Sequence, residues 1–267
     1  MALPEPSETS TALVTGASSG IGAAIATSLA NRGHALTLVA RREDRLTELA
    51  SELHEECGVR AGVVACDLAD PAERDRLAAK LTELGLEVEV LVNNAGFGFA
   101  GDFVDADRER QVEMVRVNCE TVVDLTGRYV PEMAQRGRGA VINVASMAAF
   151  QPLPKNATYA ATKAFVLSFT EALHHELKGA GVTVSAVCPG PVRTEFMDAA
   201  GMERTESTPD FIWTSAEDVA EEAVKAAEAG KRAVVPGRIN YVGSLLGRYS
   251  PRKIVLPLSS RIWSRVE

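Results

Sequence analysis

The chain has 267 residues, of which 46% are hydrophobic and 24% are charged, the ordinary composition of a globular protein. A chain of this length can form one large α/β domain or two smaller ones, and it buries a sizeable core. Its formal net charge of -8 argues against a general affinity for nucleic acid.

The opening stretch "MALPEPSETS" combines acids and prolines without an apolar core, so we expect neither a signal peptide nor a membrane anchor there. Cys57, Cys66, Cys119 and Cys188 lie far apart in the chain, which favours free thiols in a reducing compartment over disulfides. The four histidines form no metal-binding pattern. We therefore expect a cytoplasmic protein without a metal site.

Short β-branched stretches alternate with longer amphipathic ones along the chain. The short stretches predict strands at residues 11–15, 35–40, 61–66, 88–93, 140–145, 182–188 and 232–236. Most are apolar at consecutive positions, as in strands buried on both faces of a parallel sheet. The alternation predicts a single doubly wound α/β domain of the Rossmann type over residues 11–236, with a seven-stranded parallel sheet and helices on both faces. Residues 1–10 would form an N-terminal tail.

Three glycines, Gly16, Gly20 and Gly22, lie between the first predicted strand and the first predicted helix. In such a turn, backbone N–H groups approach a pyrophosphate and the start of the helix adds partial positive charge. The alternative is a plain tight turn, and the spacing G-x-x-x-G-x-G differs from the usual dinucleotide fingerprint. The position between strand and helix favours a dinucleotide site, formed by Gly16, Ser18, Ser19, Gly20, Ile21 and Gly22.

The end of the second predicted strand bears on which dinucleotide binds. An Asp or Glu there holds the ribose 2′-hydroxyl of NAD, whereas an Arg suits the 2′-phosphate of NADP. Here Ala40 is followed by Arg41 and Arg42, and the first acid is Glu43. Arginine donates two parallel charge-assisted hydrogen bonds to a phosphate, so the pattern favours NADP(H). The alternative is that both arginines only begin an exposed helix.

Tyr159 and Lys163 stand four positions apart in "YAATK", at the start of a predicted helix. Residues at i and i+4 share a helical face, with Cβ atoms roughly 5–6 Å apart. Taken alone, the pair is most simply explained as two polar residues on a surface helix.

Six features occur in order along the chain: "TGASSGIG", "NNAG", Asn118 within a helix, Ser146, "YAATK" and "PGPVRT". Together they resemble the short-chain dehydrogenase/reductase family, over residues 10–236. The stretch "LVARR" and the basic C-terminus resemble the NADP-preferring, general-oxidoreductase branch of bacteria. The resemblance implies an oxidoreductase that transfers a hydride between NADP(H) and a carbonyl or secondary alcohol.

The resemblance assigns catalysis to Asn118, Ser146, Tyr159 and Lys163. Tyr159 would be the general acid in reduction and the base in oxidation. A free phenol has a pKa near ~10, so action near neutral pH asks for a drop of about 3 units, or roughly 4 kcal/mol. One positive charge at about 4 Å supplies about that much at an effective dielectric near ~20, so Lys163 would lower the pKa of Tyr159.

The other roles also follow from the resemblance. Ser146 would donate a hydrogen bond to the substrate oxygen as charge develops there. Lys163 would also hydrogen-bond the nicotinamide ribose, and Asn118 would hold Lys163 through a water. Further cofactor contacts are implied at Asp67, Leu68, Asn94, Ala95, Gly96, Tyr159, Lys163, Pro189, Gly190, Val192 and Thr194.

By resemblance, the substrate pocket lies between Ser146, the stretch after "NNAG" and an irregular loop at 194–214. Its predicted lining is Ser146, Met147, Phe97, Met197 and Trp213. Further apolar candidates nearby are Phe99, Phe150 and Phe211. These side chains predict an apolar carbonyl or alcohol substrate; the alternative is that they only pack under the loop.

Two other functions remain open: a non-catalytic NADP-binding sensor or scaffold, and an NAD-dependent alcohol dehydrogenase. The filled catalytic positions argue against a scaffold, which has no chemical need for Tyr159 beside Lys163. By resemblance, the helices at 108–136 and 158–178 would pair with symmetry mates in a homodimer or homotetramer.

The C-terminal extension, residues 237–267, is strongly basic although the whole chain is acidic. Its basic residues stand among Leu, Ile and Val; they are Arg238, Arg248, Arg252, Lys253, Arg261 and Arg265. Three interpretations remain open for the extension: a lid or interface element, a segment that lies weakly on a membrane surface, or a disordered tail.

Overall fold

The computed structural model describes residues 3–201 and 210–263. Parts of three predicted segments therefore lie outside the described residues: 1–2 of the N-terminal tail, 202–209 of the loop at 194–214, and 264–267 of the extension, with Arg265. The side chain of Arg261 also lies outside the described part.

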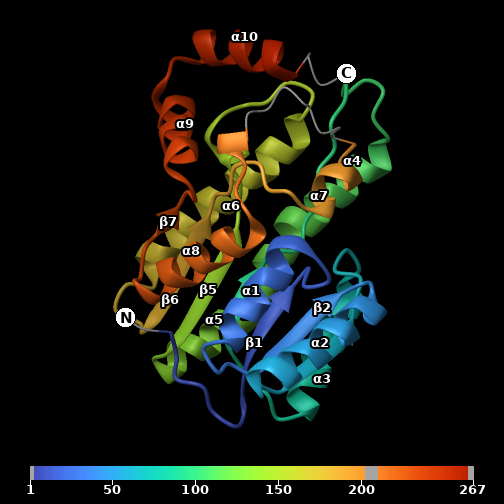
Figure 1. Cartoon of the computed structure of the whole chain (residues 1–267), viewed down its shortest axis with the longest axis vertical. Helices are drawn as coiled ribbons and strands as arrows, with labels where there is room; N and C mark the ends of the chain where they lie inside the picture. Colours follow the sequence, from blue (N-terminus) through green and yellow to red (C-terminus); the bar gives the residue numbers. More distant parts are fainter. Residues whose placement is uncertain (1–2, 202–209, 264–267) are drawn as a thin grey trace.

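A parallel sheet of seven strands, in the order β3-β2-β1-β4-β5-β6-β7, forms the centre of the molecule (Figure 1). The strands are β1 Ser10–Thr15, β2 Leu36–Ala40, β3 Ala61–Ala65, β4 Glu87–Asn93, β5 Gly139–Val144, β6 Val182–Val187 and β7 Ala233–Val234. Each begins within one residue of its predicted start, and β7 is shorter than predicted. The predicted doubly wound α/β architecture is confirmed.

Helices cover both faces of the sheet. They are α1 Gly20–Ala30, α2 Glu43–Cys57, α3 Pro71–Glu83, α4 Arg108–Val115, α5 Thr121–Arg136, α6 Ala157–Glu176, α7 Glu195–Ala199, α8 Ala216–Glu228, α9 Arg238–Tyr249 and α10 Arg252–Trp263. Side chains of the strands alternate between the two faces: Ala12 and Val14 join the apolar cluster with α1, α2 and α8, whereas Leu13 joins the cluster with α3 and α5. Both faces of the sheet are therefore buried, which explains the continuous apolar strands.

Local chemistry sets where several helices begin. At the start of α3 the Asp70 side chain accepts a 2.8 Å hydrogen bond from the backbone N–H of Ala72, and Pro71 occupies the first turn. At the start of α8 the Ser215 hydroxyl accepts from the N–H of Asp218 at 3.0 Å. These caps fix where each of the two helices begins.

The strand order reverses at β1, which pairs with β2 on one side and β4 on the other. In open α/β sheets the crevice at the carboxyl ends of the strands, beside such a reversal, is where ligands bind. The glycine turn follows β1, and "NNAG" begins at the end of β4 with Asn93. The two motifs therefore meet at this crevice.

The C-terminal helices α9 and α10 lie at one end of the molecule, away from α2 and α3 (Figure 1). α9 packs against the 3-10 turn Met147–Phe150, directly after Ser146. Across the described residues, no helix is both long and apolar enough to cross a membrane.

Candidate active site

A cavity of about 830 Å³ runs along the carboxyl ends of the strands. The segments directly after β1, β2, β3, β4, β5 and β6 all contribute to its lining. The predicted cofactor residues that line it are Gly16, Ser18, Ser19, Gly20, Ile21, Arg41, Arg42, Asp67, Leu68, Asn94, Ala95, Gly96, Tyr159, Lys163, Pro189, Gly190, Val192 and Thr194. The predicted substrate residues that line it are Phe97, Ser146, Met147 and Met197.

Three predicted residues lie outside this lining set: Gly22, Asn118 and Trp213. Gly22 packs tightly against the glycine turn and Asn94. A Cβ there would lie 2.3 Å from the carbonyl oxygen of Gly16 and 2.4 Å from the amide nitrogen of Asn94, so a larger residue does not fit without a shift. The Arg193 guanidinium lies 5.7 Å from the centre of the Trp213 ring. A substrate contact of Trp213 therefore stays a prediction.

The glycine turn is shaped to hold an anion against the start of α1. Gly16 and Gly20 adopt φ values of +66° and +57°, which residues other than glycine rarely adopt. Ser19 precedes α1 without capping it through its side chain, and the first turn holds no acid. The first N–H groups of α1 thus lack a side-chain acceptor, and the turn fits the pyrophosphate of a dinucleotide.

Asn94 fastens the "NNAG" stretch to the glycine turn. Its amide donates to the carbonyl oxygens of Thr15 at 2.9 Å and Gly16 at 3.2 Å. The Thr15 hydroxyl in turn accepts from the N–H groups of Asn94 and Ala95, at 3.0 and 3.1 Å. Thr15 is the first residue of "TGASSGIG", but the motif alone predicts no role for it; the structure shows that it connects both loops of the crevice.

Arg42 reaches across the glycine turn. Its guanidinium donates to the hydroxyls of Ser18 at 3.1 Å and Ser19 at 2.9 Å, and it forms an ion pair with Glu195 at 2.8 Å. Arg42 holds the pKa of the Glu195 carboxyl below its usual value. Arg41 lines the same cavity. A cluster of guanidinium and hydroxyl groups therefore stands where β2 ends, a donor set that fits a phosphate.

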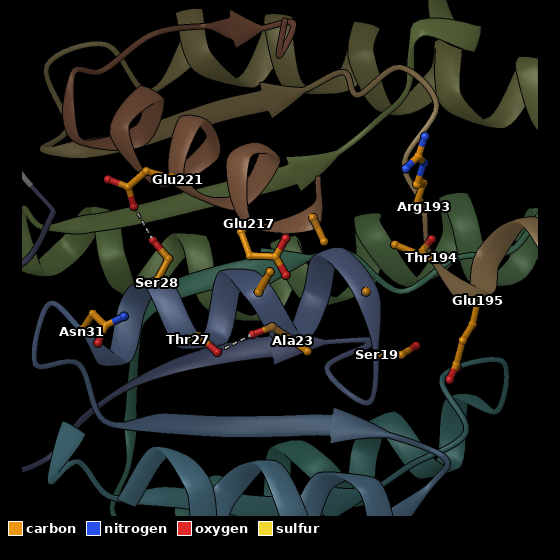
Figure 2. A pocket seen from close by; sticks show the side chains of 13 residues that line it. Ser19, Ala23, Thr27, Ser28, Asn31, Arg193, Thr194, Glu195, Glu217 and Glu221 are labelled. Atoms are coloured by element: carbon orange, nitrogen blue, oxygen red, sulfur yellow. Dashed lines mark hydrogen bonds between the residues drawn. The ribbon is translucent and has the colours of Figure 1, made fainter. Parts of the chain in front are cut away.

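A second hollow, of about 770 Å³, lies on the other side of the glycine turn, between α1 and α8 (Figure 2). It shares Ser19, Gly20, Thr194 and Glu195 with the first cavity. In it the Ser28 hydroxyl donates to Glu221 at 3.0 Å. Within the described part of the chain, none of the four predicted catalytic residues lines this hollow. The chemistry is therefore assigned to the first cavity.

Tyr159 lies in the first turn of α6, with its hydroxyl hydrogen-bonded to that of Ser146. Ser146 follows β5, and its Oγ accepts from the N–H of Ala148 at 3.1 Å. The Phe196 ring packs on Tyr159 with 5.6 Å between ring centres. The phenol and the Ser146 hydroxyl thus stand together in the wall of the cavity.

Lys163 lies one turn further along α6 and is only 5% exposed. Its ammonium donates to the carbonyl of Val144 at 2.8 Å and lies 5.8 Å from the centre of the Tyr159 ring. Burial lowers the pKa of Lys163 to about 8, because the charged form loses its hydration.

The pKa of Tyr159 is raised to about 12, chiefly by burial, and the hydrogen bond with Ser146 lowers it only in part. This direction is opposite to the lowering that the sequence led us to expect from Lys163. The cause is the loss of hydration of the buried phenolate, and the Lys163 ammonium donates its hydrogen bond to Val144. The phenol therefore holds its proton firmly at neutral pH.

Asn118 lies in a π-helical turn, Arg116–Glu120, between α4 and α5. Its side chain accepts from the N–H of Phe97 at 3.1 Å and donates to the Phe97 carbonyl and the Thr162 hydroxyl, both at 3.0 Å. A Cβ on Gly96 would lie 2.9 Å from Asn118 Oδ1 and 3.5 Å from Lys163 Nζ. Asn118 and Lys163 therefore both lie close to Gly96, and their link through a water stays a prediction.

The substrate end of the cavity has more lining residues than the sequence predicts. Additional apolar residues include Val117, Ala148, Leu153, Phe196 and Ile212, and additional polar ones include Arg110, Glu113, Gln151, Asn156 and Asn240. Phe99, Phe150 and Phe211 are not part of the lining. Phe196 could have been found, because it stands two residues after Thr194. No sequence motif around Asn240 predicts a place in the site. Asn240 belongs to α9 and packs on Gly190: a Cβ on Gly190 would lie 2.5 Å from the side-chain amide of Asn240.

All four cysteines are free; Cys66 and Cys188 are buried, and Cys57 and Cys119 only partly so. Among residues 3–201 and 210–263, no group of three or more His, Cys, Asp or Glu side chains is arranged to hold a metal ion.

A family model described as short chain dehydrogenase matches residues 10–205. Very-long-chain 3-oxoacyl-CoA reductase of Anas platyrhynchos is 35% identical over 204 residues, which cover 74% of this chain and 65% of that protein. Sulfoacetaldehyde reductase 2 of Chromohalobacter salexigens is 38% identical over 215 residues, covering 78% of this chain and 84% of that protein. A solved structure of a short-chain dehydrogenase from Sphingobium yanoikuyae in complex with NADPH is 34% identical, has a TM-score of 0.78, and covers 84% of this chain and 87% of that one.

The alignment thus spans 65% of the length of the duck 3-oxoacyl-CoA reductase. The family model covers the glycine turn, Ser146, Tyr159 and Lys163. The chain therefore belongs to the short-chain dehydrogenase/reductase family.

Proposed function

We propose that the chain transfers a hydride between NADP(H) and a carbonyl or secondary alcohol of an apolar substrate, with Tyr159 as the general acid and base. The observation that carries this proposal is a convergence in one cavity. Ser146, Tyr159 and Lys163 stand at its substrate end, and Arg41 and Arg42 line it beyond the glycine turn. One extended ligand can then reach from the arginines to the phenol.

The cofactor assignment rests on donors near the end of β2. Arg42 with Ser18 would hold a 2′-phosphate, because a guanidinium and a hydroxyl both donate to phosphate oxygens. Arg41 adds a second cation on the same cavity. The NADPH in the solved relative from Sphingobium yanoikuyae is consistent with this choice. When bound, the nicotinamide cofactor supplies or accepts the hydride.

The proton chemistry follows from the environment of Tyr159. Burial raises the pKa of Tyr159, so the phenol carries the proton that a general acid gives to the carbonyl oxygen in reduction. Ser146 donates to the same substrate oxygen and stabilises the charge that develops on it. Lys163, held by Val144, stabilises the phenolate after the proton has left.

The substrate class rests on the lining of the cavity near Tyr159. Phe97, Met147, Leu153, Phe196 and Met197 offer an apolar surface to the body of the substrate. The relatives are named for a 3-oxoacyl-CoA and for sulfoacetaldehyde, both carbonyl compounds of very different size. Their names support carbonyl reduction and do not choose between substrates.

We further propose a cytoplasmic homodimer or homotetramer whose catalytic domain spans residues 11–236 and is followed by a C-terminal extension at 237–267. Support for assembly comes from exposed apolar side chains on α4, α5 and α6. These are Val112, Val115, Val123 and Phe165. Such side chains on neighbouring helices are typical of an interface with another copy.

A paired titration tests the cofactor assignment. NADPH and NADH are titrated into the wild type, Arg41→Ala and Arg42→Ala. We expect NADPH to bind the wild type at least about ten-fold more tightly than NADH, a difference of about 1.4 kcal/mol. Each Arg variant should lose most of that margin, because it removes a partner of the 2′-phosphate and leaves the rest of the site intact.

Arg45→Ala is the matched control, since Arg45 is an exposed arginine of α2 outside the cavity lining. It should keep the preference for NADPH. Equal or tighter binding of NADH to the wild type would replace the proposal by an NAD-dependent alcohol dehydrogenase. Absence of binding by both cofactors would contradict the redox function as a whole.

A further inference from the structure

Helix α9 exposes several large apolar side chains. Four of them define the C-terminal apolar patch: Ile239, Val242, Leu246 and Tyr249. Within α9 the members recur at spacings of three and four residues, so they share one helical face. Leu246 is 63% exposed and Tyr249 is 74% exposed.

The opposite face of α9 is small and polar, and it packs on the wall of the active-site cavity. Asn240 is buried there and donates to the carbonyl of Ile212 at 3.2 Å. A Cβ on Gly243 would lie 3.1 Å from Met147, and one on Gly247 would lie 3.0 Å from Gln151. The helix thus turns its small side inward and its apolar side outward, the reverse of a helix that packs on a protein core.

Positive charge accompanies this patch. Among the described side chains of α9 and α10, the exposed basic ones are Arg238, Arg248, Arg252 and Lys253. After Glu228 the sequence contains no acid until Glu267, although the whole chain carries a net charge of -8. Arg248 lies 3.7 Å from the Glu171 carboxylate, which partly neutralises it. The patch is therefore an apolar surface within a basic segment of an acidic protein.

We propose that the C-terminal apolar patch binds the surface of a membrane containing anionic lipid. Its apolar side chains would enter the boundary between headgroups and acyl chains, while the nearby arginines and Lys253 meet negatively charged headgroups. Pairing of two copies through the same patch would bring these like charges together, which disfavours a second copy as the occupant.

Membrane binding would also bring the cavity close to lipid. One side of α9 supplies Asn240 to the cavity, and the opposite side carries the patch. An apolar substrate dissolved in the bilayer would then lie next to the helix that walls its binding site. Binding itself needs no cofactor and no substrate, so its failure is distinguishable from failure of the proposed redox function.

Flotation of the full chain with lipid vesicles tests this proposal. One set of vesicles is pure phosphatidylcholine, and the other contains about one third phosphatidylglycerol. We expect at least about ten-fold stronger binding to the anionic vesicles, weakened by added salt because charge screening increases. The double variant Leu246→Ser/Tyr249→Ser should lose at least about ten-fold of this binding.

Two further variants make the comparison sharper. Arg238→Glu/Lys253→Glu keeps the apolar side chains and should bind anionic vesicles as weakly as neutral ones. Leu84→Ser, which removes an exposed apolar side chain at the end of α3, is the matched control and should bind like the wild type. Thermal unfolding verifies that each variant is folded.

Several results would overturn the proposal. Wild type that stays in solution with anionic vesicles, or that binds both vesicle types equally, contradicts it. So does vesicle binding that survives Leu246→Ser/Tyr249→Ser. If light scattering shows that the same double variant splits an oligomer while the wild type ignores vesicles, the patch joins two copies of the chain.

Discussion

Lys163 donates a 2.8 Å hydrogen bond to the backbone carbonyl of Val144, the last residue of β5. Ser146 follows two residues later, and its hydroxyl pairs with that of Tyr159. One strand end therefore positions both the ammonium and the serine hydroxyl, while α6 carries Tyr159 and Lys163 on a common face. The relative placement of the three groups depends on the docking of a single helix on a single strand.

The first prediction concerns the cost of burying Lys163. Burial lowers the pKa of Lys163 from 10.5 to about 8, so between these values the unfolded chain binds more protons than the folded one. The free energy of unfolding therefore rises with pH across that window. Relative to Lys163→Met, which cannot titrate, the wild type should gain about 2 kcal/mol between about pH 7 and about pH 9.5.

Urea unfolding of both proteins at the two pH values measures this difference. Subtracting the variant cancels every other titrating group that the two proteins share. The variant should also lose about 100-fold or more in turnover, because no charge remains beside Tyr159. A wild type whose stability relative to the variant stays flat or falls with pH would show that the Lys163 ammonium is not destabilised by burial.

The second prediction concerns the phenol itself. Tyr159→Phe removes one oxygen and keeps the ring that packs on Phe196. Carbonyl reduction should fall by about 100-fold to 10,000-fold, the usual contribution of a positioned general acid. NADPH affinity should change little, since the phosphate groups bind elsewhere in the cavity. Steady-state rates and a binding titration separate the two effects.

Tyr129→Phe is the matched control for this change. Tyr129 is also buried, and its hydroxyl lacks a hydrogen-bond partner in the described structure, so removing that oxygen should leave activity unchanged. Its stability should stay equal or rise slightly, because an unpaired buried hydroxyl is unfavourable. Turnover of Tyr159→Phe comparable to that of Tyr129→Phe would remove Tyr159 from the proposed chemistry.

Much of the fold was predictable from the sequence, because the strands are buried on both faces and each follows a glycine or polar turn. The glycine turn and the Tyr159–Lys163 pair were predictable for a similar reason: their chemistry depends on residues that are close in the sequence. Contacts between distant segments were not. Arg42 follows β2 and Glu195 follows β6. The two residues form an ion pair because the carboxyl ends of these parallel strands lie at the same edge of the sheet.

Two other features required the three-dimensional structure. The helix around Asn118 looks regular in sequence, yet it contains the π-helical turn Arg116–Glu120 that turns the Asn118 side chain to Phe97 and Thr162. The pKa of Tyr159 moves opposite to the expected direction, because counting one nearby charge ignores the loss of water around the phenol. The burial of a side chain depends on how the whole chain packs, so a single sequence motif does not predict it.

The third prediction concerns the ion pair between Arg42 and Glu195, at 2.8 Å. If Arg42 holds the 2′-phosphate as proposed, Glu195 competes with that phosphate for the same guanidinium. Glu195→Gln should therefore tighten NADPH binding up to about five-fold, the worth of an exposed ion pair of about 1 kcal/mol. NADH binding should stay unchanged, because NADH lacks the phosphate.

Titration of both cofactors against both proteins measures this effect. Glu217→Gln is the matched control: Figure 2 shows Glu217 in the neighbouring hollow, and among the described residues the ion-pair partner of Arg42 is Glu195. In the double variant with Arg42→Ala, the effect of Glu195→Gln should disappear. Weaker NADPH binding by Glu195→Gln would mean that the carboxylate helps to hold the cofactor instead of competing with it.

The fourth prediction concerns Gly22, which supports the turn without lining the cavity. A Cβ there would lie 2.3 Å from the carbonyl oxygen of Gly16 and 2.4 Å from the Asn94 amide, so both would have to move. Gly22→Ala should reduce the free energy of unfolding by about 1–3 kcal/mol and weaken both cofactors alike. The control is Gly58→Ala: that residue has a φ of +69° but nothing within 4 Å of a new Cβ, so it should cost about 1 kcal/mol and leave cofactor binding intact. Cofactor affinity in Gly22→Ala equal to that in Gly58→Ala would show that contact between Gly16 and Asn94 does not shape the site.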